Sequence, residues 1–334
     1  MDPTVLAHVK WYVEDTQHAT VDPGFVSRPS SLGLLAAAVA AAGLWRLVAR
    51  RFLGAPELRS LQWLGRLAPW IPRLLAVHLG VSLLSLAVAD AYLAPNLSLA
   101  AIRDGWLLAF GQGLIGVWLI SGVRLRPAAL AVVALGPLGI VLDGPVPVLE
   151  AVDVLGLAAF LALLPPGPDR YGARAVSRTE LFGPLLMLRL GVGVSLIVLA
   201  FSEKLLVPQL ARELLDVRPW LDPLQQLGLT NGPDTFIQVA SAVEVLIGLL
   251  VISGAAPQLA VLLAAVPFNM TLVFFDRYEL IGHLPVYGAL LALLVYGSHP
   301  RLAPTVTRLP ATRDRSYRSR SSSAAACPSI ARGR

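Results

Sequence analysis

Hydrophobic residues along this chain are gathered into nine runs, each of roughly the length that crosses a bilayer as a helix. A transmembrane helix needs about 20 mainly apolar residues, with a usual range of about 17–25. The pattern therefore predicts an all-α, polytopic membrane helix bundle with about nine transmembrane helices. The runs occupy residues 31–49, 73–94, 106–122, 127–142, 149–165, 184–206, 236–253, 257–275 and 281–297.

Two of these runs resemble each other closely enough to indicate an internal duplication. Residues Gly80–Leu97 (GVSLLSLAVADAYLAPNL) align without a gap on Gly193–Leu210 (GVSLIVLAFSEKLLVPQL), and nine of the eighteen positions are identical. The alignment places Asp90 on Glu203. A second, shorter match places GVWLISG (116–122) on GLLVISG (248–254), which sets Gln112 against Glu244. Repeats of this kind are the first guide to an architecture.

The duplication divides the chain into a leading helix and two four-helix units. Each unit has an even number of spans, so the two copies have the same orientation and form parallel repeats about an axis along the membrane normal. The predicted segments are an outer polar N-terminal segment (1–30), the leading helix with an inner interfacial segment (31–72), the first unit (73–165), an inner basic loop (166–183), the second unit (184–297) and a disordered basic cytoplasmic tail (298–334).

Composition supports a membrane protein and explains the net positive charge. Hydrophobic residues make up 56% of the 334 residues and charged residues only 14%, against about 25% charged in soluble domains. The formal net charge is +6, but its placement follows membrane topology and does not favour nucleic acid as a partner. Cys327 is the single cysteine, so we expect neither a disulfide framework nor a thiolate metal site. No metal is predicted.

The distribution of basic residues predicts which way the chain crosses the membrane. If the N-terminus is outside, the three inner loops hold nine arginines and the tail holds eight, while all outer segments together hold six basic residues. Basic residues near span ends favour the cytoplasmic side. We therefore predict a multi-pass protein of the cell (plasma) membrane, with the N-terminus outside and the C-terminus in the cytoplasm.

Ionisable residues inside membrane spans are costly, and they indicate function by default. Here they are Asp90, Glu150, Asp153, Glu203, Lys204, Glu244 and His283, and most fall in the predicted outer half. Glu244 is the deepest acid and is the first candidate for a catalytic proton acceptor, with His283 as the second. A structural interpretation stands beside this one, because Glu203 and Lys204 could pair and close the bundle, and His283 could cap a helix start.

Other polar residues of the second unit are candidates for substrate binding beside Glu244. Asn269 is the nearest deep polar residue in the next span, and Asp276 follows that span on the predicted outer side. With Glu203 and Lys204 they form the predicted substrate-binding set. The outer segment 207–235 contains LARELLDV, an amphipathic stretch that is either a lid over this site or a connection between two helices.

A haem held by two histidines is disfavoured by their depth. His78 lies about five residues from the inner end of its span, and His283 lies at the outer end of its own. At 1.5 Å rise per residue, the two histidines differ in depth by roughly 20 Å, which is too far for one iron. The cofactor is left open, with a quinone as the candidate.

Three motifs of the second unit carry a resemblance to a known family. They are FSEKLL (201–206), EVLIGLLVISG (244–254) and IGHLPVYG (281–288), together with Arg189 in the first helix of the unit. In these features residues 184–297 resemble the DoxX-like membrane proteins, which are related to the DoxD/DoxX subunits of thiosulfate:quinone oxidoreductase. The resemblance implies a four-helix membrane unit tied to redox or sulfur metabolism. The first unit departs from the pattern, with Gln112 and Asp153 where the second has Glu244 and His283.

Two functions from different classes are open on this basis. The first is a membrane subunit of an oxidoreductase system that acts on quinone or another lipid-soluble substrate near the outer leaflet, with a membrane or extracytoplasmic redox protein as partner. The second is a non-enzymatic scaffold or carrier of lipid or a small molecule. In the first, Glu244 takes a proton; in the second, small-residue helix faces at Gly191, Gly193 and Gly248 matter more.

Overall fold

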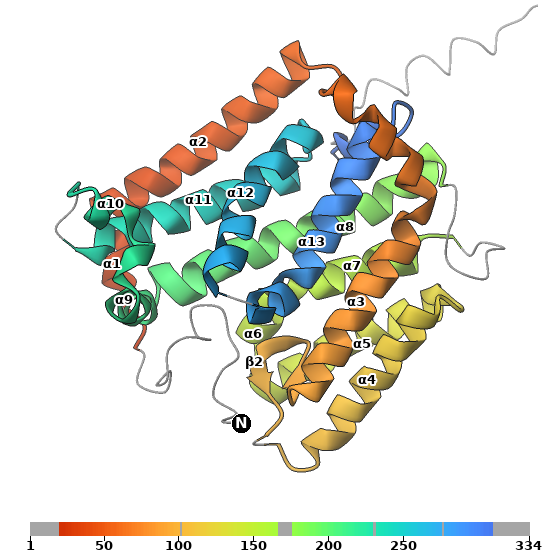
Figure 1. The fold of residues 1–334 in the computed structure, drawn as a ribbon, viewed down its shortest axis with the longest axis horizontal. Helices are drawn as coiled ribbons and strands as arrows, with labels where there is room; N and C mark the ends of the chain where they lie inside the picture. The colour runs from red at the N-terminus through yellow and green to blue at the C-terminus, as the bar shows by residue number, and fades with distance from the viewer. Residues whose placement is uncertain (1–19, 101, 166–175, 230–231, 276, 310–334) are drawn as a thin grey trace, which may run out of the picture.

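The structure, a computed structural model, describes residues 20–100, 102–165, 176–229, 232–275 and 277–309, and these residues form a bundle of long helices (Figure 1). Helices α2, α8, α11, α12 and α13 belong with α3, α4, α5 and α7 to the body of the bundle. Short helices and one hairpin cover its ends. The elements are α1 (Pro23–Ser27), α2 (Pro29–Phe52), η2 (Arg59–Trp70), α3 (Ile71–Val88), β1 (Ala91–Tyr92), β2 (Ala94–Ser98), α4 (Gly105–Ser121), α5 (Leu125–Asp143), α6 (Pro145–Glu150), α7 (Val152–Leu163), α8 (Arg178–Ala200), η3 (Phe201–Leu205), α9 (Pro208–Val217), η4 (Pro219–Leu221), α10 (Pro223–Gln226), α11 (Pro233–Ser253), α12 (Pro257–Phe275), α13 (Arg277–Ser298) and α14 (Ala303–Val306).

Membrane character is confirmed at the level of helix length and composition. Among the described residues, five helical segments are long and apolar enough to span a bilayer: Pro29–Phe52, Arg59–Val88, Leu125–Asp143, Arg178–Leu205 and Pro233–Ser253. Four shorter apolar helices lie at the positions of the other predicted runs, at Gly105–Ser121, Val152–Leu163, Pro257–Leu272 and Gly282–Ser298. The count of nine spans therefore stays a prediction.

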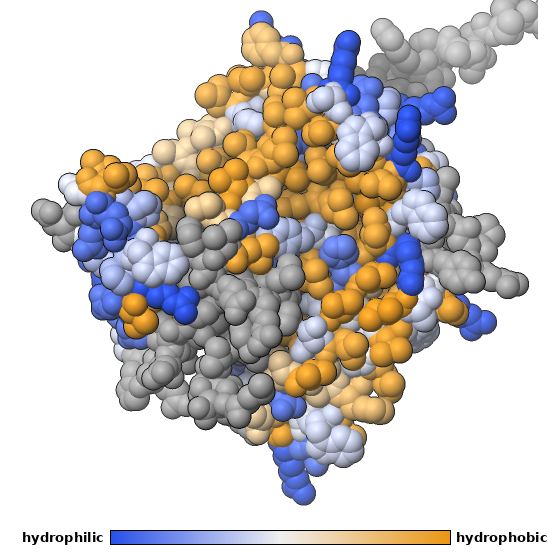
Figure 2. Space-filling view, viewed as in Figure 1, coloured by the Kyte–Doolittle hydropathy of each residue, from blue (hydrophilic) through white to orange (hydrophobic). Residues whose placement is uncertain are grey.

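The surface also fits a lipid environment. Large apolar side chains project outward from the long helices; Leu44 of α2 is 61% exposed and Val141 of α5 is 82% exposed. Figure 2 shows apolar side chains spread over the middle of the visible face, with hydrophilic residues gathered toward its ends. Contiguous apolar surface of this kind marks a membrane or protein contact.

Glycines bring helix pairs into backbone contact in both halves of the bundle. A Cβ on Gly80 of α3 would meet the Gly116 carbonyl of α4 at 2.6 Å, and a Cβ on Gly193 of α8 would meet the Gly248 carbonyl of α11 at the same distance. Small residues at such crossings let two helices approach closely. These four glycines are the ones that the repeat alignment places in register.

A short β-hairpin is the one departure from an all-α fold in the described part of the chain. The predicted run 73–94 stops as a helix at Val88, and β1 then pairs antiparallel with β2. Asp90 and Leu93 adopt left-handed backbone conformations, with φ of 52° and 54°. Gln112 of α4, which is fully buried, accepts from the Leu93 amide and so fixes the hairpin against the bundle. Tertiary hydrogen bonding, which the hydrophobic pattern does not record, ends the helix early.

At the opposite end, a buried arginine ties the segment after α13 to the bundle. Arg189 of α8 is fully buried and donates to the backbone carbonyls of Ile252, Val306 and Arg308. The predicted disordered tail (298–334) is therefore packed at its start, where α14 lies with Val306 fully buried. Residues 310–334 lie outside the described part of the chain.

Candidate functional site

The bundle encloses a cavity of about 650 Å³ between its two halves, at the end that carries α6, η3 and α9. A volume between about 300 and 1,000 Å³ is usual for a pocket that binds a small organic molecule. Both halves contribute to its lining, with Ser82 of α3 and Glu150 of α6 from the first half and Glu203 and His283 from the second. Residues from both sequence segments, 73–165 and 184–297, therefore line the cavity.

The cavity walls are mainly apolar. Leucine, valine, isoleucine, alanine and phenylalanine side chains cover most of the surface, and a smaller group of ionisable side chains lies among them. Pockets of this composition bind apolar ligands and use a few polar groups to fix their orientation. Apolar lining residues from six different elements include Leu86, Val154, Leu196, Leu214, Ile247 and Val286.

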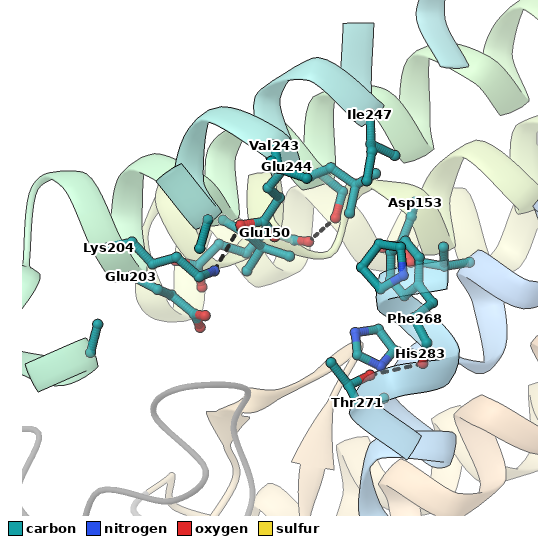
Figure 3. A pocket seen from close by; sticks show the side chains of 18 of the residues that line it. Glu150, Asp153, Glu203, Lys204, Val243, Glu244, Ile247, Phe268, Thr271 and His283 are labelled. Atoms are coloured by element: carbon teal, nitrogen blue, oxygen red, sulfur yellow. Dashed lines mark hydrogen bonds and ion pairs between the residues drawn. The ribbon is translucent and has the colours of Figure 1, made fainter. Parts of the chain in front are cut away.

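The main polar contact in the cavity joins Lys204 to Glu244. The Lys204 Nζ lies 2.7 Å from the Glu244 Oε2, and the two side chains are 19% and 22% exposed (Figure 3). Lys204 comes from η3 and Glu244 from the middle of α11, so the pair joins two helices. An isolated charge is costly in an apolar surrounding, and each of these groups offsets the charge of the other.

A π-helical turn places Lys204 and its neighbour at the cavity. After Ala200 the chain leaves α8 and forms η3, in which the Leu206 amide donates to the Phe201 carbonyl at 2.8 Å, five residues back. Glu203 in this turn is only 2% exposed and also lines the cavity. Single π-turns inside helices occur frequently at functional sites. The hydrophobic pattern predicts an ordinary helix over 184–206, and nothing in the residues indicates the extra residue in this turn.

Two further acids enter the cavity from the first half of the bundle. Glu150 ends α6 and Asp153 lies in the first turn of α7; they are 4% and 6% exposed. The Ser195 hydroxyl of α8 donates to the backbone carbonyl of Glu150 and holds this segment against α8. Both acids are unusual inside a span, but they are not among the predicted site residues, because nothing local to α6 and α7 indicates that they face α11 and α13.

His283 lies across the cavity from the ion pair, at the α13 wall. It is 5% exposed, and its ring meets the ring of Phe268 edge to face, with centroids 5.0 Å apart and planes at 84°. The Tyr287 hydroxyl donates to the Phe268 carbonyl at 2.7 Å and connects α13 to α12 next to this contact. Figure 3 shows His283 and Phe268 on one side of the cavity and Lys204 and Glu203 on the other.

Of the six predicted site residues, the structure brings together four. Glu203, Lys204, Glu244 and His283 all line the cavity. Asn269 does not: its side chain is exposed, and its amide donates to the Ala265 carbonyl of its own helix. Asp276 lies outside the described residues, so its predicted role is untested.

The equivalent positions in the first half are used differently. Gln112, set against Glu244 by the repeat, donates to the carbonyls of Leu83 and Ala91 as well as accepting from the hairpin, so its amide is engaged in holding structure. Asp90, set against Glu203, is exposed at the end of α3. The first half therefore supplies acids to the cavity through Glu150 and Asp153, of which Asp153 is aligned with His283, and not through Asp90 or Gln112.

The segment predicted as a lid or connection forms α9, η4 and α10. Leu210 and Leu214 of α9 pack with Phe25 of α1, and Ala211 and Leu215 line the cavity from the same helix. Arg212 on its other side bonds Asp234 at 2.7 Å, at the start of α11. The helix thus covers the cavity and is tied to α11, while movement as a lid stays a prediction.

In chemical terms the cavity offers four carboxyl groups, one ammonium group and one imidazole in apolar walls. The described residues contain no group of three or more His, Cys, Asp or Glu side chains placed to hold a metal ion. Comparison with protein-family models, curated proteins and solved structures finds no match to this chain. The resemblance to the DoxX-like proteins therefore stays a prediction.

Proposed function

We propose that this protein is a membrane subunit of an oxidoreductase system and that its cavity binds quinol, or another lipid-soluble substrate with hydroxyl groups. The observation that carries the proposal is the Lys204–Glu244 pair in a mainly apolar cavity that Glu150, Asp153 and Glu203 also line. The walls suit an apolar ring, and carboxylates accept hydrogen bonds from hydroxyl groups.

In this proposal the chain's own residues bind the substrate head and take its protons. Oxidation of a quinol to a quinone releases two electrons and two protons. The electrons pass to a partner redox protein, and Glu244 takes the first proton from the hydroxyl that it binds. His283 or a second carboxyl group takes the other. Lys204 holds Glu244 in place at the wall and donates to the quinone oxygen that forms.

The proposal includes an orientation for the membrane. The cavity end is the outer end if the N-terminus is outside, as the distribution of basic residues predicts. We also infer that the two halves are parallel repeats, which the matching glycine contacts of Gly80 with Gly116 and Gly193 with Gly248 support. A tag after Arg334 should then be inaccessible from outside intact cells, and labelling of that tag from outside would reverse the orientation.

Glu244→Gln tests the proposed function directly. Gln keeps the size of the side chain and removes the proton acceptor, so we expect electron transfer from quinol to fall strongly while the protein is still made and folded. Asp104→Asn is the matched control, since Asp104 is an exposed acid that does not line the cavity. Quinone or lipid co-purified from the native protein is identified by mass spectrometry. Full activity of the Glu244→Gln protein would remove the acid–base role.

A second candidate, a carrier of lipid without redox chemistry, is favoured by the apolar cavity walls. It differs in its expected response, because transport of an apolar ligand should tolerate Glu244→Gln. The glycine faces do not separate the two candidates: Gly193 packs against Gly248, and Gly191 against Gly156, all within one chain, so their substitution disturbs the bundle in either case. Co-purification of a phospholipid in place of quinone would favour the carrier.

A further inference from the structure

Part of the cavity lining lies on the outer surface of the bundle. Most lining residues are buried; Leu196 is 3% and Phe268 is 8% exposed. Val243 of α11 and Met270 of α12 also line the cavity, yet they are 43% and 48% exposed. A residue that touches both the cavity and the outside marks a place where the two meet. Trp220 of η4 is a third such residue, 49% exposed at the end of the bundle. The cavity therefore opens at that end and also sideways, between α11 and α12.

The depth of this opening indicates what it faces. Val243 is ten residues from each end of α11 (Pro233–Ser253), one of the helices long enough to span a bilayer. At 1.5 Å per residue this is about 15 Å from either end, or half of a hydrocarbon core about 30 Å thick. The opening thus lies near the middle of the membrane, where it meets lipid chains and not water.

The path of the two helices explains why they part here. Gly254 and Ala256 make a tight left-handed turn between α11 and α12 at the far end, with φ of 60° and 47°. Beyond that turn Ala42 of α2 packs against both helices, at Leu250 and Ala260. Pro267 then interrupts the hydrogen bonding of α12 at the level of the cavity, which bends or kinks a helix. The helices are held together at one end and open toward the other.

We propose that this opening is the entrance for the substrate and holds its apolar chain. The walls of the opening are apolar, with Val239 and Val243 on one side and Met270 on the other, while Glu244 follows Val243 directly. A single-chain amphiphile fits this arrangement, with its polar head at the Lys204–Glu244 pair and its chain extending between α11 and α12 into the bilayer. The inference rests on the proposed function for the chemistry of the head, but not for the direction of entry.

Cysteine labelling in lipid nanodiscs tests the entrance. Starting from Cys327→Ser, which removes the single native thiol, Val243→Cys and Met270→Cys are compared with Val266→Cys. Val266 is 63% exposed on α12 but does not line the cavity, so it is the matched control. We expect all three thiols to react with a lipid-soluble maleimide and not with a charged methanethiosulfonate. A decyl-substituted benzoquinone should slow labelling several-fold at 243 and 270 but leave 266 unchanged.

The outcomes separate this inference from the proposed function. Rapid reaction of 243 or 270 with the charged reagent, or no reaction of either with the maleimide while 266 reacts, would show that the opening does not face lipid and would overturn the inference. If the same benzoquinone without its alkyl chain protected these thiols and the decyl form did not, the proposed position of the ligand's alkyl chain between α11 and α12 would be refuted. Binding of the quinone head in the cavity would still stand. Labelling from the lipid phase that neither quinone alters would refute the quinone function and this inference together.

Discussion

Neutralising the Lys204–Glu244 pair, one partner at a time and then together, tests how the site is held. The two charged atoms are 2.7 Å apart, and each side chain is about four-fifths buried. At an effective dielectric constant near 20, two unit charges at this distance attract by about 6 kcal/mol. The cost of removing both charges from water offsets much of that attraction, so the net value of the pair is far smaller.

Removing one partner is a different change, because it takes away the Lys204–Glu244 interaction while the other charge stays in a mainly apolar cavity. Loss of one member of a buried pair typically costs about 3–5 kcal/mol, whereas replacing both by neutral groups is often close to neutral. With one-fifth of each side chain still exposed, we expect Lys204→Met and Glu244→Gln each to lower the free energy of unfolding by about 3 kcal/mol. The double variant should lose no more than either single variant, which gives a coupling energy of about 3 kcal/mol.

Reversible unfolding in mixed detergent and SDS micelles, followed by circular dichroism, measures these values. Arg103 and Asp104 provide the matched control: their closest charged atoms are 3.9 Å apart and the side chains are 98% and 65% exposed, so neutralising this pair should show no measurable coupling. The reasoning would be refuted if the losses at Lys204 and Glu244 were simply additive, since additivity means that the two charges do not interact.

Three further substitutions test the packing of the bundle. Gly193→Ala should lower the free energy of unfolding by about 1–3 kcal/mol, because the added Cβ would lie 2.6 Å from the Gly248 carbonyl oxygen. Gly43→Ala is the control, and it should be neutral or stabilising because nothing lies within 4 Å of its Cβ position. Equal effects of the two substitutions in the same SDS titration would contradict the close packing. Arg189→Met should lower the free energy of unfolding by about 3 kcal/mol and make the segment after α13 accessible to protease, because the bonds to the Val306 and Arg308 carbonyls are lost. An unchanged digestion pattern would argue against a role of Arg189 in holding that segment. Gln112→Leu should lower the free energy of unfolding by about 1–3 kcal/mol, because the Leu93 amide and the Ala91 carbonyl of the hairpin lose their partner. Hydrogen exchange in β1 and β2 should then be faster. Unchanged exchange would mean that the hairpin does not depend on Gln112.

Hydrophobic patterning predicted the positions of the long helices well. The predicted runs 106–122 and 257–275 coincide within a residue with Gly105–Ser121 and Pro257–Phe275. Errors came where polar groups decide the backbone path. Predicted helix 73–94 ended at Val88, because Gln112 holds the following residues as a hairpin.

For the candidate site, the sequence showed which residues are chemically unusual but not where their side chains point. A charge inside an apolar run is conspicuous, so Glu203, Lys204, Glu244 and His283 were found, and all four line one cavity. Asn269 is uncharged and was a candidate as the nearest deep polar residue of the next span, but its side chain is exposed and bonded to its own helix.

What the sequence alone determined is the class of protein: the long apolar helices, their approximate limits and the costly charges within them follow from composition along the chain. Only the tertiary structure decided which side of each helix faces the cavity, that Glu150 and Asp153 join the site, and that α11 and α12 part beside Val243. The physical reason is that these helices are apolar on every side. Periodicity shows which face of a helix is buried when one face is polar, but where lipid and protein core are equally apolar, the packing of neighbouring helices settles it.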